Sequence, residues 1–327
     1  MRLLVLGGTL FLGRHVAEAA LARGHDVATF TRGVTGTPPD GALDLHGDRN
    51  DPDALPEALD GWRPDLVVDT SCQTRAAACN AAAVLGDVRG YAFVSSLSAY
   101  ATWPPGPVGP EDDEPTWTTD DDEYGPIKAF AERAIGAIVG ERFLTARAGL
   151  ILGPLDQIYR LGYWLDRTSR GGRIVVPAEG FDQPIAAVDA RDLADWLVDM
   201  AERGQGGAVN ATGPSGMTTL RGLLELCREV TGGDAEWVPV PERELLDAGV
   251  EPWTHLPFWL PADMAGTAWD VNTTRARVLG LPSRDLRATV ADTWAWQQTA
   301  ERTFWSRYGH PRPGLPAELE TKLLGDR

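Results

Sequence analysis

The sequence predicts an α/β protein built on a doubly wound parallel sheet, followed by a smaller mixed lobe. Through the first half of the chain, short apolar runs alternate with amphipathic stretches, as expected for strands buried on both faces by helices. After residue 154 this alternation weakens, and nine of the twelve tryptophans lie beyond residue 151. The C-terminal part therefore reads as a separate, aromatic lobe.

The elements follow in order from periodicity and turn signals. We expect strands at 3–6, 25–30, 65–69 and 90–95, and helices at 11–22, from about 51, and from 124 or 125. The Pro-, Gly- and acid-rich segment 101–123 reads as an exposed loop, with a lid role as the alternative. A strand at 185–188, a helix at 192–202 and a strand at 208–211 are expected to rejoin the sheet.

Charge and cysteine content exclude several classes of function. The net charge of −17 and the pI of about 4.7 argue against nucleic acid or an anionic membrane as a partner. Three scattered cysteines form neither a disulfide framework nor a metal site, so no metal is expected. The opening apolar run is too short for a signal peptide or a membrane span. We expect a cytoplasmic protein.

A glycine-rich turn follows the first predicted strand and opens the first predicted helix. In this position, backbone N–H groups and the helix N-terminus can hold a pyrophosphate. The turn therefore predicts a Rossmann-type dinucleotide site. Leu10 stands where the usual spacing has a third glycine. The expected cofactor contacts here are Gly7, Gly8, Thr9, Phe11, Leu12 and Gly13.

The end of the second strand favours NADP(H) over NAD(H), which stays open as the alternative. NAD sites place a carboxylate there, whereas this chain has Thr31 and Arg32. A guanidinium can pair with a 2′-phosphate, although Arg32 could also be an ordinary surface cation. Arg14 is a second candidate for phosphate, and Asp48 a candidate for the adenine amino group; each could equally be structural.

The candidate chemistry rests on Tyr124 and Lys128, four residues apart and hence on one face of a helix. A nearby ammonium favours phenolate over phenol, so Tyr124 can exchange a proton with a carbonyl or alcohol oxygen, and Lys128 can also hold the cofactor ribose. The chain has 30 basic residues, but Lys128 and Lys322 are its only lysines. Ser96, at the end of the preceding strand, is the best candidate to hydrogen-bond the reacting oxygen.

These features divide the chain into two functional parts. Residues 1–154, rejoined by about 185–213, form the NAD(P)-binding domain, and residues 155–184 and 214–327 form the substrate lobe. Several aromatic residues of this lobe fall in irregular, Pro-punctuated segments, which favours an aromatic or apolar substrate over a charged nucleotide sugar. The alternative is that they form the core of the lobe. The residues in question are Trp164, Trp253, Phe258, Trp259 and Trp269.

The Gly-rich turn, the Ser-Ser strand end and the Tyr-x-x-x-Lys motif, in this order, resemble the extended short-chain dehydrogenase/reductase family, in its epimerase and dehydratase branch. The resemblance covers residues 1 to about 300 and implies Ser96, Tyr124 and Lys128 as the catalytic triad. Family members that dehydrate nucleotide sugars carry an acidic pair after the serine, where this chain has Leu97 and Ser98. Epimerases usually carry an Asn-containing segment where this chain has Arg147-Ala148-Gly149.

We therefore expect an NADP(H)-dependent carbonyl reductase or alcohol dehydrogenase acting on a small metabolite. An epimerase with tightly bound cofactor is one alternative, because it uses the same triad. A non-catalytic NADP(H)-sensing protein is the other, since Leu10 and Thr31-Arg32 also resemble a branch with sensors and RNA-binding relatives. A homodimer is open, because the apolar positions of the helix from 124 could pair with a second copy or face the sheet.

Overall fold

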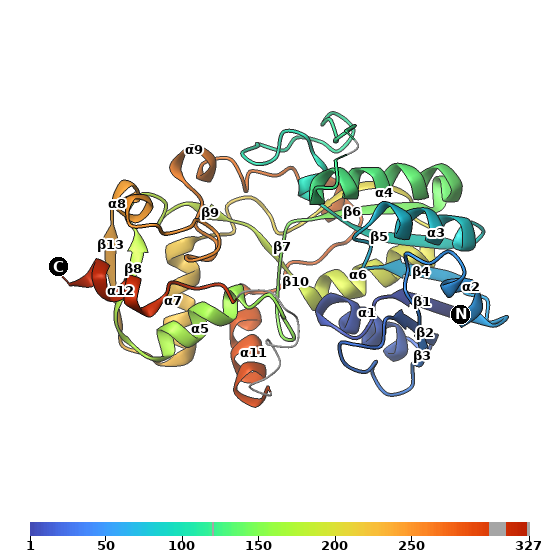
Figure 1. Cartoon of the computed structure of the whole chain (residues 1–327), viewed down its shortest axis with the longest axis horizontal. Coiled ribbons are helices and arrows are strands. Elements are labelled where there is room, and N and C mark those ends of the chain that lie inside the picture. Colours follow the sequence, from blue (N-terminus) through green and yellow to red (C-terminus); the bar gives the residue numbers. More distant parts are fainter. Residues whose placement is uncertain (120, 301–311, 326–327) are drawn as a thin grey trace.

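A computed structural model describes residues 1–119, 121–300 and 312–325 of the chain. The molecule has two lobes (Figure 1), one built around a large sheet and one that contains α12 (Ala317–Leu324). Trp305, one of the nine tryptophans counted toward the second lobe, lies outside the described residues.

The first lobe contains a seven-stranded parallel sheet, which confirms the predicted fold class. Its strand order is β11-β6-β5-β4-β1-β2-β3, and every neighbouring pair is parallel. The order reverses between β1 and β4, and ligands of such sheets bind at this switch point. The strands are β1 (Arg2–Leu6), β2 (Asp26–Thr31), β3 (Leu43–His46), β4 (Leu66–Asp69), β5 (Gly90–Ser96), β6 (Phe143–Ala148) and β11 (Gly207–Ala211).

Helices cover both faces of this sheet, because the strands bury alternate residues on opposite sides. In β1, Leu3 and Val5 pack with α1 and α6, whereas Leu4 and Leu6 pack with the helices of the other face. The helices around the sheet are α1 (Phe11–Ala22), α2 (Ala54–Leu59), α3 (Arg75–Leu85), α4 (Tyr124–Val139) and α6 (Ala190–Arg203), with short 3₁₀ turns η1 (Leu97–Ala99) and η2 (Gly140–Arg142).

Two later segments were expected to join the large sheet. The strand expected at 208–211 does so, but the strand expected at 185–188 does not. β11 pairs with β6 at the edge of the large sheet. The segment expected as one strand at 185–188 instead forms β9 (Pro184–Ile185) and β10 (Ala187–Asp189). β10 pairs with β7 (Leu150–Leu152) in a separate two-stranded sheet, and β9 pairs with β12 (Thr218–Thr219). These small sheets connect the two lobes (Figure 1).

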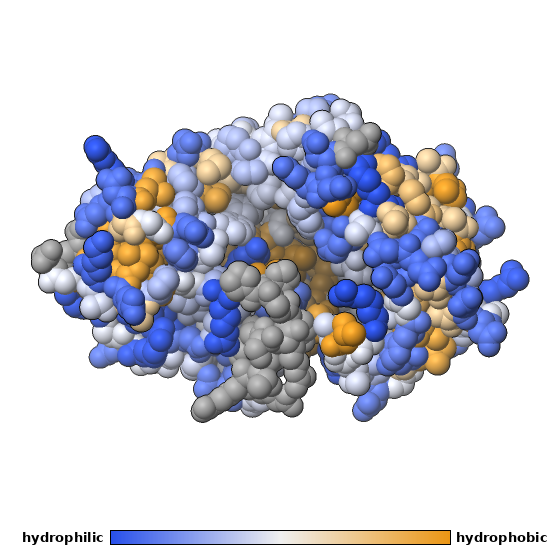
Figure 2. All heavy atoms as spheres, viewed as in Figure 1, coloured by the Kyte–Doolittle hydropathy of each residue, from blue (hydrophilic) through white to orange (hydrophobic). Residues whose placement is uncertain are grey.

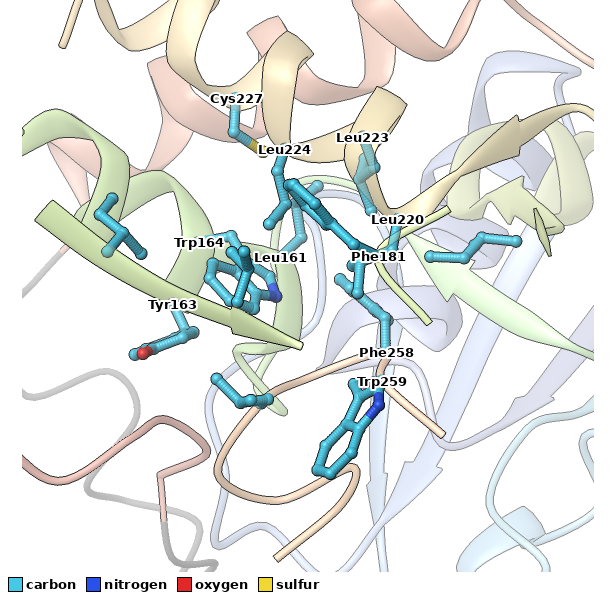
Figure 3. Close-up of a cluster of buried hydrophobic side chains, with 14 of the residues drawn as sticks. Leu161, Tyr163, Trp164, Phe181, Leu220, Leu223, Leu224, Cys227, Phe258 and Trp259 are labelled. Atoms are coloured by element: carbon cyan, nitrogen blue, oxygen red, sulfur yellow. The ribbon is translucent and has the colours of Figure 1, made fainter. Parts of the chain in front are cut away.

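The second lobe packs helices around a two-stranded parallel sheet of β8 and β13. Figure 3 shows its core, in which Trp164 and Phe181 lie beside leucines of α7. The remaining elements of the chain are α5 (Arg160–Ser169), β8 (Gly172–Pro177), α7 (Leu220–Thr231), β13 (Ala235–Val240), α8 (Glu242–Asp247), α9 (Ala262–Ala265), α10 (Thr274–Val278), α11 (Leu286–Thr299) and α12 (Ala317–Leu324).

The segment before α4 is only partly the exposed loop that its composition predicts. Val108 and Glu111 are buried, so the expectation is wrong at these positions. Val108 pairs with Val271, and the Trp103 indole donates to the Ala268 carbonyl at 2.7 Å. The loop therefore contacts the second lobe, and Trp103 and Pro104 line the cleft between the two lobes. Its lid role stays a hypothesis.

Within residues 1–119, 121–300 and 312–325, no helix is both long enough and apolar enough to span a bilayer.

Candidate active site

A cleft of about 1110 Å³ runs from the switch point of the sheet to the second lobe. In Figure 2 the surface is hollowed between the lobes, with hydrophobic side chains visible in its depth. Of the predicted catalytic and cofactor-binding residues, all except Arg14 line this one cleft. They are Gly7, Gly8, Thr9, Phe11, Leu12, Gly13, Thr31, Arg32, Asp48, Ser96, Tyr124 and Lys128.

The glycine-rich turn has a backbone that side chains would not tolerate. Gly7 and Gly8 have φ of 111° and 107°, and a Cβ on Gly7 would lie 2.5 Å from Thr70 Oγ1. Position 10 does not require glycine, because the φ of −130° and ψ of 145° at Leu10 are ordinary extended values. The turn thus forms a backbone cradle at the N-terminus of α1, and an NAD(P) pyrophosphate fits this cradle.

Three residues were proposed to bind the adenosine end of the cofactor, and their environments differ. They are Arg32, Asp48 and Arg14. Arg32 lines the cleft and is exposed, with no hydrogen bond to another of the described residues. Asp48 also lines the cleft, and one of its carboxylate oxygens accepts from both nitrogens of Asn50. Arg14 donates to Glu18 and to the Thr37 carbonyl, at 2.9 Å each. Arg14 therefore braces the loop after β2, and its contact with a cofactor phosphate stays a prediction.

Sequence reasoning missed a buried ion pair beneath the cofactor half of the cleft. Arg49 donates from two nitrogens to the Asp69 carboxylate at 2.7 Å each, and also to Ser71 Oγ. Tyr91 donates to the same carboxylate, and burial raises the pKa of its phenol well above the ordinary value. The pair ties the end of β4 to the turn after β3. Asp69 at the end of an apolar strand, at the switch point, was the available signal.

Tyr124 and Lys128 lie one turn apart on α4 and face the same cleft. The Lys128 ammonium is 5.6 Å from the centroid of the Tyr124 ring. It is buried and donates to the carbonyls of Cys72 at 2.9 Å and Val94 at 3.1 Å. An ammonium has three N–H donors, so one remains for a bound ribose or for the Tyr124 oxygen.

Close packing fixes the start of α4 against η1, the turn that follows β5. A Cβ on Gly125 would lie 2.3 Å from the Ser98 carbonyl oxygen, so only glycine permits this approach. Ser96 Oγ accepts from the Ser98 N–H at 3.1 Å, which leaves its own O–H to donate. Tyr124 is 50% exposed and open to the cleft. The hydroxyls of Ser96 and Tyr124 can therefore both reach a ligand.

A buried polar network supports the strand end that carries Ser96. The Ser95 hydroxyl donates to Glu132 of α4 at 2.5 Å, and Arg147 of β6 pairs with the same carboxylate at 2.7 Å. The Arg147 guanidinium also lies over the Tyr100 ring. Burial raises the pKa of Tyr100 to about 12, so this phenol is a structural group that stays protonated. The Ser95 hydroxyl is thus engaged by this network.

The aromatic residues proposed as pocket walls divide into two groups. Trp164, Phe258 and Trp259 are fully buried in the core of the second lobe (Figure 3), so the expectation that they line a pocket is wrong. Trp253 and Trp269 line the cleft, with stacked rings whose centroids are 6.0 Å apart. Trp253 has a left-handed φ of 66°, which is costly for a bulky residue and concentrates at functional sites.

The fold, with a glycine-rich turn at the switch point of a doubly wound sheet, defines the class of Rossmann-type dinucleotide-binding proteins. Residues 3–212 match the NAD dependent epimerase/dehydratase family. The chain belongs to this family, the extended short-chain dehydrogenases/reductases, and is an NAD(P)-dependent enzyme.

Individual relatives agree with this assignment. The chain is 27% identical to dTDP-6-deoxy-L-talose 4-dehydrogenase (NAD(P)(+)) of Kitasatospora kifunensis, over 91% of this chain and 96% of that protein. It is 30% identical to 2'-dehydrokanamycin reductase of Streptomyces kanamyceticus, over 51% of this chain and 45% of that protein. The fold is similar to that of the UDP-glucose 4-epimerase of Thermus thermophilus in complex with NAD, with a TM-score of 0.69 at 20% identity, covering 92% and 100% of the two chains.

Proposed function

We propose that this protein is an NADP(H)-dependent carbonyl reductase or alcohol dehydrogenase, in which Tyr124 is the general acid and base. The observation that carries the proposal is that Ser96, Tyr124 and Lys128 line the same cleft as the phosphate-binding turn. A bound nicotinamide supplies the hydride in the reductive direction. The two curated relatives named above are a dehydrogenase and a reductase, which supports net redox turnover.

The protein groups have separate tasks in this reaction. The Ser96 hydroxyl donates to the carbonyl oxygen and orients it, and the Tyr124 phenol delivers the proton to that oxygen as it becomes an alcohol. The buried Lys128 ammonium stabilises the phenolate that remains on Tyr124 until solvent returns a proton. In the oxidative direction the same groups take the proton from the alcohol.

The proposed substrate is a small metabolite that presents an apolar or aromatic face to Trp253 and Trp269. Their stacked rings, together with Leu260 and Trp103, give the second-lobe side of the cleft a largely apolar wall. The curated relatives act, by their names, on sugar compounds. A sugar ring also has a C–H face that can pack on an indole, so sugar-derived ketones belong in the same test.

The test is a panel of carbonyl compounds, from aryl ketones to sugar ketones, assayed by the consumption of NADPH and of NADH. The proposal predicts net consumption of NADPH in step with alcohol formation. Inversion of a sugar carbon with no net cofactor consumption would instead identify an epimerase. Tight cofactor binding with neither reaction across the panel would identify a sensor.

A further inference from the structure

Arg160 places a positive charge, with no ion pair among the described residues, on the second-lobe side of the cleft. It is the first residue of α5 and lines the cleft, and its guanidinium carbon lies 4.8 Å from the centroid of the Trp253 ring. The side chain is half-buried. Among residues 1–119, 121–300 and 312–325, it has neither a hydrogen bond to its guanidinium nor an ion pair.

Other arginines that enter the interior are treated differently by this fold. Arg49 is paired with Asp69, Arg147 with Glu132 and Arg167 with Glu320, at N–O distances of 2.7 to 3.0 Å. Acidic groups are not scarce, because the chain has 47 of them against 30 basic residues. Half-buried arginines without a carboxylate, such as Arg142 and Arg277, donate to backbone carbonyls instead. A half-buried guanidinium with neither a carboxylate nor a carbonyl acceptor among the described residues is therefore an exception, and a ligand would satisfy it.

The neighbours of Arg160 do not replace such a ligand. A cation–π contact with Trp253 uses the charge but accepts none of the five N–H groups. Burial lowers the pKa of Arg160, while Asp156 and Tyr124 act in the opposite direction. The Asp156 carboxylate accepts from the Ile158 N–H at 2.8 Å, and burial raises its pKa to about 6.

We propose that Arg160 binds an anionic group of the substrate, a carboxylate or a phosphate, and thereby sets which carbonyl compounds the enzyme accepts. The inference rests on the proposed function and names the class of its substrate. Arg32 and Arg160 are the cleft-lining arginines without a carboxylate partner among the described residues. Arg32 directly follows β2 in the first lobe, and Arg160 begins α5 in the second lobe; Figure 1 shows these two elements in the two lobes. Arg32 thus faces the cofactor end, and Arg160 the substrate end.

This assignment revises the expectation of an uncharged substrate. An anion held by Arg160 would lie beside Trp253, so the part of the substrate next to the anion can pack on the apolar wall. A guanidinium offers two parallel N–H donors, which fixes the orientation of a carboxylate or phosphate. The anion would therefore determine which end of the substrate points toward Tyr124.

The experiment measures ligand binding without turnover. The protein is saturated with NADP⁺ or NAD⁺, whichever binds more tightly, so that the glycine-rich turn is occupied by the cofactor. The probes are benzoate, phenyl phosphate and their uncharged analogue benzamide, titrated by calorimetry. We expect at least one anion to bind about 10-fold or more tightly than benzamide, in line with a hydrogen bond to a charged group. The tighter of the two anions distinguishes a carboxylate from a phosphate.

Variants test whether Arg160 causes the preference for an anion over benzamide. Arg160→Met should abolish it, Arg160→Lys should retain part of it, and Arg243→Met, at an exposed site near the start of α8, should leave it unchanged. Tyr124→Phe should keep the anion preference while losing turnover, which separates a failure of this inference from a failure of the proposed reaction. The inference is overturned if neither anion binds more tightly than benzamide, or if the preference persists in Arg160→Met.

Discussion

The Lys128 ammonium lies 5.6 Å from the centre of the Tyr124 ring and is held there by two backbone carbonyls, those of Cys72 and Val94. The Cys72 carbonyl belongs to the turn after β4 and the Val94 carbonyl to β5, and these two strands are neighbours in the sheet. These two hydrogen bonds therefore fix the position of the ammonium, although it lies at the end of a long side chain. This arrangement makes Lys128 both a structural and a functional residue.

Replacing Lys128 by Met should reduce turnover by about 100-fold or more, because the charge that stabilises a Tyr124 phenolate is lost. It should also destabilise the fold by about 1–3 kcal/mol, because two buried carbonyls lose their donor. The measurements are steady-state kinetics and urea unfolding. Lys322→Met is the matched control, since this other lysine is exposed on α12, and it should change neither quantity.

Arg32→Ala should weaken NADPH binding by about 1.5–3 kcal/mol, the range for a hydrogen bond to a charged group, and leave NADH almost unaffected. The reason is that only NADPH carries the 2′-phosphate that a guanidinium at this position can pair with. Fluorescence titration of both reduced cofactors tests the prediction. Equal losses for the two cofactors would show that Arg32 supports the loop and does not select the cofactor.

Trp253→Ala should raise KM for the carbonyl substrate several-fold and leave the Kd of NADPH unchanged, because Trp253 lines the substrate end of the cleft. Trp259→Ala should behave differently. This residue is fully buried in the core of the second lobe, so its truncation should lower the free energy of unfolding by about 3–5 kcal/mol. Similar effects of both variants on KM and stability would contradict the division of the aromatic residues into wall and core.

Asp156 should make the fold less stable as the pH rises. Burial raises its pKa from 3.8 to about 6, so the folded state favours the protonated form, and the stability this provides is lost as the pH rises through 6. Between pH 5 and pH 8 this single group should cost about 1.4 kcal/mol. Asp156→Asn should remove that part of the pH dependence in parallel denaturation series. An unchanged slope in the variant would contradict it.

Sequence patterns predicted the first lobe closely because its elements carry local signals. The helix expected at 11–22 begins and ends as observed, since a turn precedes it and the apolar spacing is regular. The pairing of β10 with β7 and the burial of Val108 depend on contacts between segments far apart in the chain, for which periodicity holds no information.

The candidate site was accessible to sequence reasoning where a motif ties residue type to chemistry. Tyr124 and Lys128 share a helix face, and Ser96 ends a strand, so their meeting in one cleft follows from local structure. Arg49 and Arg160 carry no such motif, and their environments differ only through tertiary packing. The same holds for the tryptophans, since irregular segments supply both the core and the wall of the second lobe.

The most direct measurement for the proposed function is the rate of NADPH consumption by Tyr124→Phe, with the carbonyl compound that the unchanged protein reduces fastest. Removing one hydroxyl leaves the ring in place, so the variant should keep its fold and its Kd for NADPH while kcat falls by about 100-fold or more. Tyr163→Phe, in the second lobe and away from the cleft lining, is the matched control and should keep the full rate. A Tyr124→Phe variant that turns over at the unchanged rate would contradict the account.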